Sequence, residues 1–146
     1  MTLRLYVAGA SRDLGRTRAF VRQAIDAYAE LGLEVVHDWT VEAERSFQAG
    51  DCDATLGPVE RHRRAKHCLD AVARADVFVV LLPDGESRGA WIELGAALML
   101  ARTRACRVVV SGDYRGTLFT ELADAICEDD AEAMKWLERA IAETLP

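Results

Sequence analysis

The chain has 146 residues, of which 51% are hydrophobic and 29% charged, so we expect one globular domain over residues 1–146 and exclude a disordered chain. The net charge of −6 argues against a protein that binds nucleic-acid polymers. We find no export signal, no apolar run long enough to span a membrane and no paired cysteines, which predicts a cytoplasmic protein with reduced thiols and no membrane partner.

Strand-like and helix-like segments alternate along the chain. Short apolar runs predict strands at residues 3–8, 33–37, 77–82, 107–110 and 125–127. Apolar residues at helical spacing predict helices at residues 16–31, 58–75, 89–102 and 131–144, and a helical segment at 117–122. In the second of these helices we expect inward side chains at Ala65, Leu69, Val72 and Ala73. Residues 41–56 are polar, so we expect a loop that contains no more than a helical turn.

This alternation predicts an α/β fold, a doubly wound parallel sheet of about five strands with helices on both faces. We expect the strand order 2-1-3-4-5. Ligands of such sheets bind beyond the carboxyl ends of the strands. The site is therefore expected in the loops at residues 9–15, 38–56, 83–89 and 111–116.

Glu93 is the only charged residue in the apolar segment 89–100, which we expect to form a buried helix. Residues three and four positions away share its helix face, and all are small: Gly89, Ala90, Ala96 and Ala97. The carboxylate should therefore face a space that its own helix does not fill. Buried carboxylates are rare without partners or a function. Glu93 is thus a candidate nucleophile or ribose ligand, the alternative being a structural carboxylate bonded to free N–H groups of the first turn.

Two loops supply further candidates. Gly9, Ser11 and Arg12 follow the first strand and precede a helix, where backbone N–H groups favour anions, although an ordinary surface loop fits equally well. Asp38 and Trp39 follow the second strand, and Trp39 either stacks on a base or packs against a neighbouring loop.

The basic stretch at residues 60–67 is interpreted as a solvated helix face. His62, His67 and Cys68 do not converge on one side of a helix, so we expect no metal there.

Three segments carry a resemblance to a known family. Tyr6 and Gly9 lie in a "YxAG" pattern, residues 69–77 match a helix end followed by an "aD" strand start, and residues 87–95 contain the "ELG" signature around Glu93. The sequence resembles the nucleoside 2-deoxyribosyltransferase-like superfamily, which includes nucleoside 5′-monophosphate N-glycosidases.

The resemblance implies a flavodoxin-like fold, a homo-oligomer, a small nucleoside or nucleotide as ligand, no cofactor, and cleavage of an N-glycosidic bond. Glu93 would be the catalytic nucleophile, and Tyr6, Ser87 and Gly89 would belong to the substrate site. Ser87 stands where the nucleotide hydrolases of the family have a phosphate-binding serine and the transferases an aspartate. Cys68 stands where the family usually has an aspartate that assists the leaving group.

Three functions follow as hypotheses. The first is an N-glycosidase or deoxyribosyltransferase that acts on a nucleoside or its 5′-monophosphate. The second is a nucleotide-binding or sensing module without catalysis, which the cysteine at position 68 motivates. The third is an NAD-cleaving activity like that of Toll/interleukin receptor-type domains, an analogy of fold alone.

Overall fold

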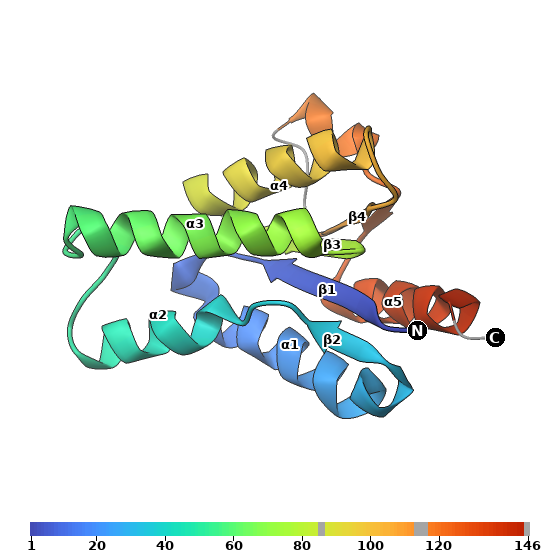
Figure 1. Ribbon diagram of the computed structural model, residues 1–146, viewed down its shortest axis with the longest axis horizontal. Coiled ribbons are helices and arrows are strands. Elements are labelled where there is room, and N and C mark those ends of the chain that lie inside the picture. Colours follow the sequence, from blue (N-terminus) through green and yellow to red (C-terminus); the bar gives the residue numbers. More distant parts are fainter. Residues whose placement is uncertain (85–86, 113–116, 145–146) are drawn as a thin grey trace.

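Strand β3 (Val77–Leu81) is the centre of a five-stranded parallel sheet with the order β2-β1-β3-β4-β5 (Figure 1). The structure is a computed structural model that describes residues 1–84, 87–112 and 117–144. The other strands are β1 (Leu3–Ala8), β2 (Leu33–Val35), β4 (Arg107–Ser111) and β5 (Ala125–Cys127). The predicted fold class and strand order are confirmed.

Helices cover both faces of this sheet. The long helices are α1 (Leu14–Tyr28), α2 (Trp39–Gln48), α3 (Pro58–Arg74), α4 (Arg88–Ala101) and α5 (Asp130–Thr144). Short 3-10 segments occupy Ser11–Asp13 (η1), Ala29–Leu31 (η2) and Leu118–Leu122 (η3). Helices α1 and α5 cover one face, and α3 and α4 cover the other (Figure 1). Among the described residues, no helix is both long enough and apolar enough to cross a membrane.

The alternation of side chains along β1 places its residues in two different cores. Leu5 and Val7 pack with α1 and α5, whereas Tyr6 and Ala8 pack with α3 and α4. Successive residues of a strand point to opposite faces, so this division follows directly from the sequence. Tyr6 is thereby carried, fully buried, into the layer that contains Glu93.

Helix α2 corrects the prediction of a loop at residues 41–56. Its start is stabilised by Asp38, whose carboxylate accepts hydrogen bonds from the backbone N–H and the hydroxyl of Thr40. Two of its large apolar residues, Val41 and Phe47, are exposed, so the sequence lacks the apolar stripe that marks a buried helix face. The preceding strand β2 is shorter than predicted, because it ends at Val35.

Two expected burial patterns are wrong. In α3, Ala71 and Val72 are buried near the C-terminal end, whereas Ala65, Leu69 and Ala73 are exposed. In α4, Ile92 and Met99 are exposed on one side, so the helix is not buried all round. Residues 85–86 of the predicted loop 83–89 and residues 113–116 of the predicted loop 111–116 lie outside the described residues.

Candidate functional site

A cavity of about 550 Å³ opens at the carboxyl ends of β1, β2 and β3. Its walls come from the segment after β1, from α2, from α3 and from the start of α4. This is the edge of the sheet where ligands of doubly wound folds bind, and the volume is in the range of small-molecule sites. The cavity is therefore the candidate functional site.

Glu93 lies in the wall of this cavity and is tied to the sheet by Tyr6. The Tyr6 hydroxyl donates a hydrogen bond to Glu93 Oε1 at 2.8 Å. Burial raises the pKa of Glu93 to about 7, although the hydrogen bonds from Tyr6 and Cys68 oppose this rise. Burial and the neighbouring Glu93 raise the pKa of Tyr6 well above its ordinary value, so the phenol keeps its proton and remains a donor. The carboxylate is thus held in one place with a pKa near neutrality, which is typical of catalytic groups.

Cys68 is the third member of this cluster. It comes from α3, lines the cavity and lies close enough to Glu93 for each group to influence the pKa of the other. Burial raises the pKa of the Cys68 thiol to about 11. At neutral pH the side chain is therefore a neutral thiol, a weaker acid than the aspartate that the resemblance leads one to expect.

The start of α4 brings Ser87 and Gly89 to the cavity. The Ser87 hydroxyl oxygen caps the helix and accepts a hydrogen bond from the backbone N–H of Ala90 at 3.4 Å. Gly89 is exposed, and a Cβ atom there would meet no atom within 4 Å, so the start of α4 is open to a ligand. The free backbone N–H groups at this helix terminus favour an anionic group.

The segment after β1 forms another wall, with Gly9, Ser11 and Arg12 at the cavity. A Cβ atom at Gly9 would overlap Thr17 Oγ1, so a larger residue fits only if the Thr17 side chain rotates or the start of α1 shifts. The close approach of this segment to α1 places the Ser11 and Arg12 side chains at the cavity mouth.

Trp39 and Asp38, both predicted as ligand-binding residues, have different roles in the structure. Trp39 lines the cavity, and its Nε1 donates a hydrogen bond to the Val7 carbonyl at 2.9 Å, which fixes the indole at the end of β1. Asp38 is absent from the cavity wall formed by the described residues, and its carboxylate caps α2 instead. Tyr6 is not part of the cavity wall that the described residues form, and its hydroxyl reaches the site by its hydrogen bond to Glu93.

Charged residues that were assigned to solvent or to a loop also line the cavity. Arg61 and Arg64 come from the basic stretch of α3, Glu42 comes from α2, and Asp53 lies between these helices. The signal in the sequence is the spacing on α3: Arg61, Arg64 and Cys68 are three and four residues apart, which places them on one face of a helix. Most of the stretch 60–67 is exposed, in line with the predicted solvated face, but Arg61 and Arg64 also border the cavity.

Comparison with known proteins supports the fold. No protein-family model and no curated protein sequence matches the chain. Among solved structures, the CMP N-glycosidase BcmB of Clostridium botulinum is similar, with a TM-score of 0.58 over 94% of this chain and 98% of that chain. The two sequences are 16% identical, so the similarity shows a shared fold.

Proposed function

We propose that this protein binds a nucleoside or nucleoside 5′-monophosphate in the cavity and cleaves its N-glycosidic bond. The observation that carries the proposal is Glu93, a partly buried carboxylate that accepts a hydrogen bond from Tyr6 at 2.8 Å in the wall of a cavity of about 550 Å³. The fold shared with a CMP N-glycosidase agrees with this chemistry.

In the proposed mechanism, Glu93 acts as the nucleophile. Its carboxylate attacks the anomeric carbon while the bond to the base breaks, and the bonding electron pair leaves with the base. The product is a glycosyl ester of Glu93, which water hydrolyses or a second base intercepts, restoring the carboxylate. The Tyr6 hydroxyl orients the attacking carboxylate. The pKa of Cys68, about 11, makes it a weak proton donor for the leaving base.

The test is base release from a panel of nucleosides, 2′-deoxynucleosides, their 5′-monophosphates and NAD, with free base measured by liquid chromatography. We expect release from at least one member, and the isosteric variant Glu93→Gln should reduce it roughly a thousand-fold or more. Because Gln keeps the shape of the side chain, circular dichroism of the variant should match that of the native protein. Full activity in Glu93→Gln would refute the assignment of the nucleophile.

A second candidate function is nucleotide binding without turnover, and the thiol at Cys68 favours it. A site with a carboxylate but no strong acid beside the leaving group can bind its ligand without cleaving it. This alternative predicts a measurable affinity for a nucleotide together with no base release. The variant Cys68→Asp would then be expected to gain base release, since it restores a carboxyl group next to Glu93.

A further inference from the structure

The cavity wall formed by the described residues holds no buried acid that could protonate a departing base. Cys68 is a neutral thiol, and its pKa of about 11 makes it a weak proton donor. Glu42 is paired with Arg63, and Asp53 is exposed. Glu93 is the proposed nucleophile and attacks in its ionised form. A base that leaves without a proton leaves as an anion, so its departure requires a positive charge that is already in place.

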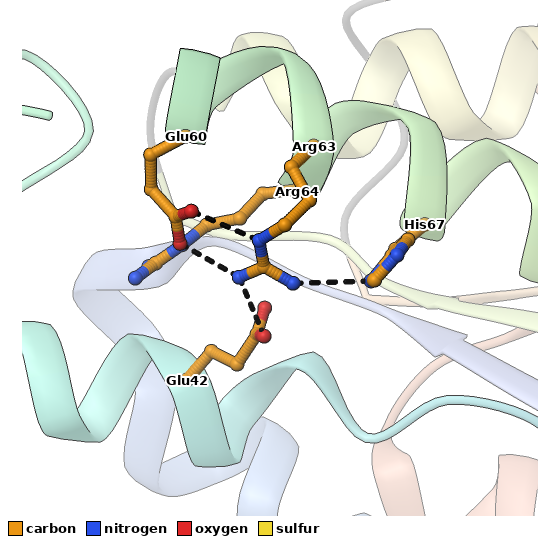
Figure 2. Close-up of polar contacts among 5 residues, drawn as sticks. All are labelled: Glu42, Glu60, Arg63, Arg64 and His67. Atoms are coloured by element: carbon orange, nitrogen blue, oxygen red, sulfur yellow. Dashed lines mark hydrogen bonds and ion pairs between the residues drawn. The ribbon is translucent and has the colours of Figure 1, made fainter. Parts of the chain in front are cut away.

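Two neighbouring arginines of α3 are used in opposite ways (Figure 2). The Arg63 guanidinium is engaged on every side. Its Nε and Nη2 donate to the Glu60 carboxylate at 2.9 and 2.6 Å. Nη2 also donates to Glu42 Oε1 at 2.8 Å, and Nη1 lies 3.3 Å from His67 Nδ1. Arg63 therefore bridges α3 to α2 and has no free edge for a substrate.

Arg64 is held by one hydrogen bond. Its Nε donates to Glu60 Oε1 at 2.8 Å, and within the described ranges 1–84, 87–112 and 117–144 its two Nη groups have no hydrogen-bond partner. Figure 2 shows the end of this side chain on the side of Glu60 that faces away from His67. Arg64 lines the cavity, and its side chain is only 22% exposed. The remaining arginines of the wall are exposed: Arg12, Arg61 and Arg88.

Glu60 fixes the direction of Arg64. Hydrogen bonds from Arg63 and Arg64 lower the pKa of Glu60 to about 2, so the carboxylate is ionised throughout the neutral range. Because Arg63 holds Glu60 by two hydrogen bonds, the carboxylate presents a fixed oxygen to Arg64 Nε. A donor that is oriented before the reaction needs no reorganisation while charge develops on the substrate.

The proposed displacement gives the leaving base a direction. The bond that breaks lies opposite to the attacking oxygen, so the base points away from Glu93 across the sugar. Cys68 borders Glu93, and Arg64 stands one helical turn before Cys68, which is about 6 Å along the axis of α3. A sugar ring spans a comparable distance. Trp39, whose indole is fixed by the Val7 carbonyl, adds an aromatic surface to the same cavity.

We propose that Arg64 is a catalytic residue that stabilises the departing base as an anion, with Glu60 as the residue that positions it. The proposal rests on the proposed function and supplies the role of the missing acid. As the Glu93 carboxylate bonds to the anomeric carbon, the bond from that carbon to the base nitrogen breaks, and its electron pair leaves on the base. The two Nη groups of Arg64 donate to oxygen and nitrogen acceptors of the base. The released base takes a proton from water, and water hydrolyses the glycosyl ester.

The experiment varies how well the base carries a negative charge. The substrate that the native protein cleaves is compared with a derivative whose base leaves more easily, which is 7-methyl for a purine and 5-fluoro for a pyrimidine. We expect Arg64→Gln to lower kcat/KM for the ordinary substrate about a hundred- to a thousand-fold. The loss should be several-fold smaller for the derivative, because its base needs less stabilisation of charge.

Arg22→Gln is the matched control, because Arg22 is exposed on α1 outside the cavity wall, and it should keep the native rates with both substrates. Glu60→Gln should cause a smaller loss that also shrinks with the activated base, which a purely structural effect would not do. Adding Cys68→Asp to Arg64→Gln should recover part of the loss, since a carboxyl group then protonates the base. If Arg64→Gln does not fold, Arg64→Lys takes its place and should show an intermediate loss with the same dependence on the base.

A binding measurement tests the same role without turnover. Isothermal titration compares 5-nitrouracil with uracil and 8-azahypoxanthine with hypoxanthine, because the first base of each pair is an anion at neutral pH and the second is neutral. We expect the native protein to bind at least one of the anions ten-fold or more tightly than its neutral counterpart. Arg64→Gln should remove this preference, and Arg22→Gln should keep it.

An equal loss for the ordinary and the activated substrate in a folded Arg64 variant would overturn the proposal. So would a native protein that does not prefer the anionic bases. Absence of base release together with a preference for the anion that depends on Arg64 would refute the proposed function and support the placement of Arg64 at the base. Base release with neither signature would refute the role of Arg64 and leave the proposed function standing, so the two failures are distinguishable.

Discussion

The pKa of Glu93 has a consequence for stability that can be measured without any substrate. The folded protein holds this proton up to about pH 7, whereas the ordinary value for glutamate is 4.5. Between these two pH values the unfolded chain has released the proton and the folded protein retains it, so the free energy of unfolding falls as pH rises. The loss is complete above pH 7 and amounts to about 3 kcal/mol at most.

Glu93→Gln should remove this loss, because the amide does not ionise. We expect its free energy of unfolding to exceed that of the native protein at pH 8 and to match it closely at pH 4, as measured by urea denaturation. Glu30→Gln, a change at an exposed glutamate of η2, should show no such dependence on pH. A Glu93→Gln effect of the same size at both pH values would contradict the raised pKa.

Tyr6→Phe tests how the buried hydroxyl acts on Glu93. The Tyr6 hydrogen bond lowers the pKa of Glu93, so its removal should raise that pKa above about 7. If Glu93 attacks as a carboxylate, the rate of base release rises with pH through the Glu93 pKa, and the rise should move to higher pH in Tyr6→Phe. At pH 7 we expect a roughly ten-fold lower rate, and at pH 9 a rate nearer to the native one.

Tyr28→Phe provides the control for that pH profile. Tyr28 packs against the core on the opposite face of the sheet, so its hydroxyl does not contact Glu93. Its profile should coincide with that of the native protein. A Tyr6→Phe profile that is lower at every pH by the same factor would show that the hydroxyl acts on something other than the ionisation of Glu93.

At the scale of elements, the junction of β1 with α1 depends on Gly9. Gly9→Ala places a methyl group against Thr17 Oγ1, and either the Thr17 side chain or the start of α1 must move to relieve the overlap. We therefore expect the free energy of unfolding to fall by about 1–3 kcal/mol. Thr17 is fully buried, and its hydroxyl lacks a hydrogen-bond partner among the described residues. Thr17→Ala alone should therefore lower the free energy of unfolding by less than the removal of a hydrogen-bonded hydroxyl would.

A double-mutant cycle measured by urea denaturation separates this clash from other effects. Because Thr17→Ala removes the clashing oxygen, the double variant should be more stable than Gly9→Ala alone. Gly15→Ala is the control, because a side chain there meets no atom within 4 Å. Alanine is the better helix former, so this change in α1 should raise the free energy of unfolding by at most about 1 kcal/mol. Additive costs in the cycle would show that Thr17 is not what excludes a side chain at Gly9.

Two elements of the cavity show why sequence patterns predicted only part of the site. Glu93 stood out because it is a single charge in an apolar run, and it lines the cavity. Of its four small neighbours, Gly89 lines the cavity too, whereas Ala90 and Ala97 are buried in the core. Arg61 and Arg64 lie in a stretch where charged residues are the rule, and nothing local distinguishes a guanidinium that faces a cavity from one that faces solvent. Only the packing of α2 opposite α3 separates them, and α2 itself lacks a clear apolar stripe.

At the scale of the whole molecule, the strand order was predictable because it depends on few rules. Continuous apolar runs such as Val77–Leu81 indicate strands buried on both faces, and right-handed crossovers then restrict the order of a parallel sheet. The position of the cavity at the carboxyl edge follows from the same topology. The chemistry of the cavity does not follow from the topology, because the residues that line it come from segments as distant in sequence as Gly9 and Glu93.

Because several elements form the cavity wall, we predict that a ligand in the cavity raises the stability of the whole domain. The cavity wall joins the segment after β1 to α2, α3 and α4, so a nucleotide bound there contacts elements that must separate when the chain unfolds. A ligand at one hundred times its dissociation constant adds about 2.7 kcal/mol to the free energy of unfolding, which corresponds to a rise in Tm of roughly 5–10 °C for a domain of this size. Differential scanning calorimetry of the Glu93→Gln protein measures the shift directly.

A ligand in the cavity should protect some helices from hydrogen exchange and leave others unchanged. Hydrogen exchange should slow in α2, at the start of α3 and at the start of α4, which all line the cavity, and should be nearly unchanged in the C-terminal half of α5, which packs on the opposite face. Phe47 is exposed on α2, and Phe47→Ser should preserve both the Tm shift and this exchange pattern because the side chain lies outside the cavity wall. Protection confined to α5, or a Tm shift of the same size with a ligand that lacks a nucleobase and a sugar, would place the binding site elsewhere.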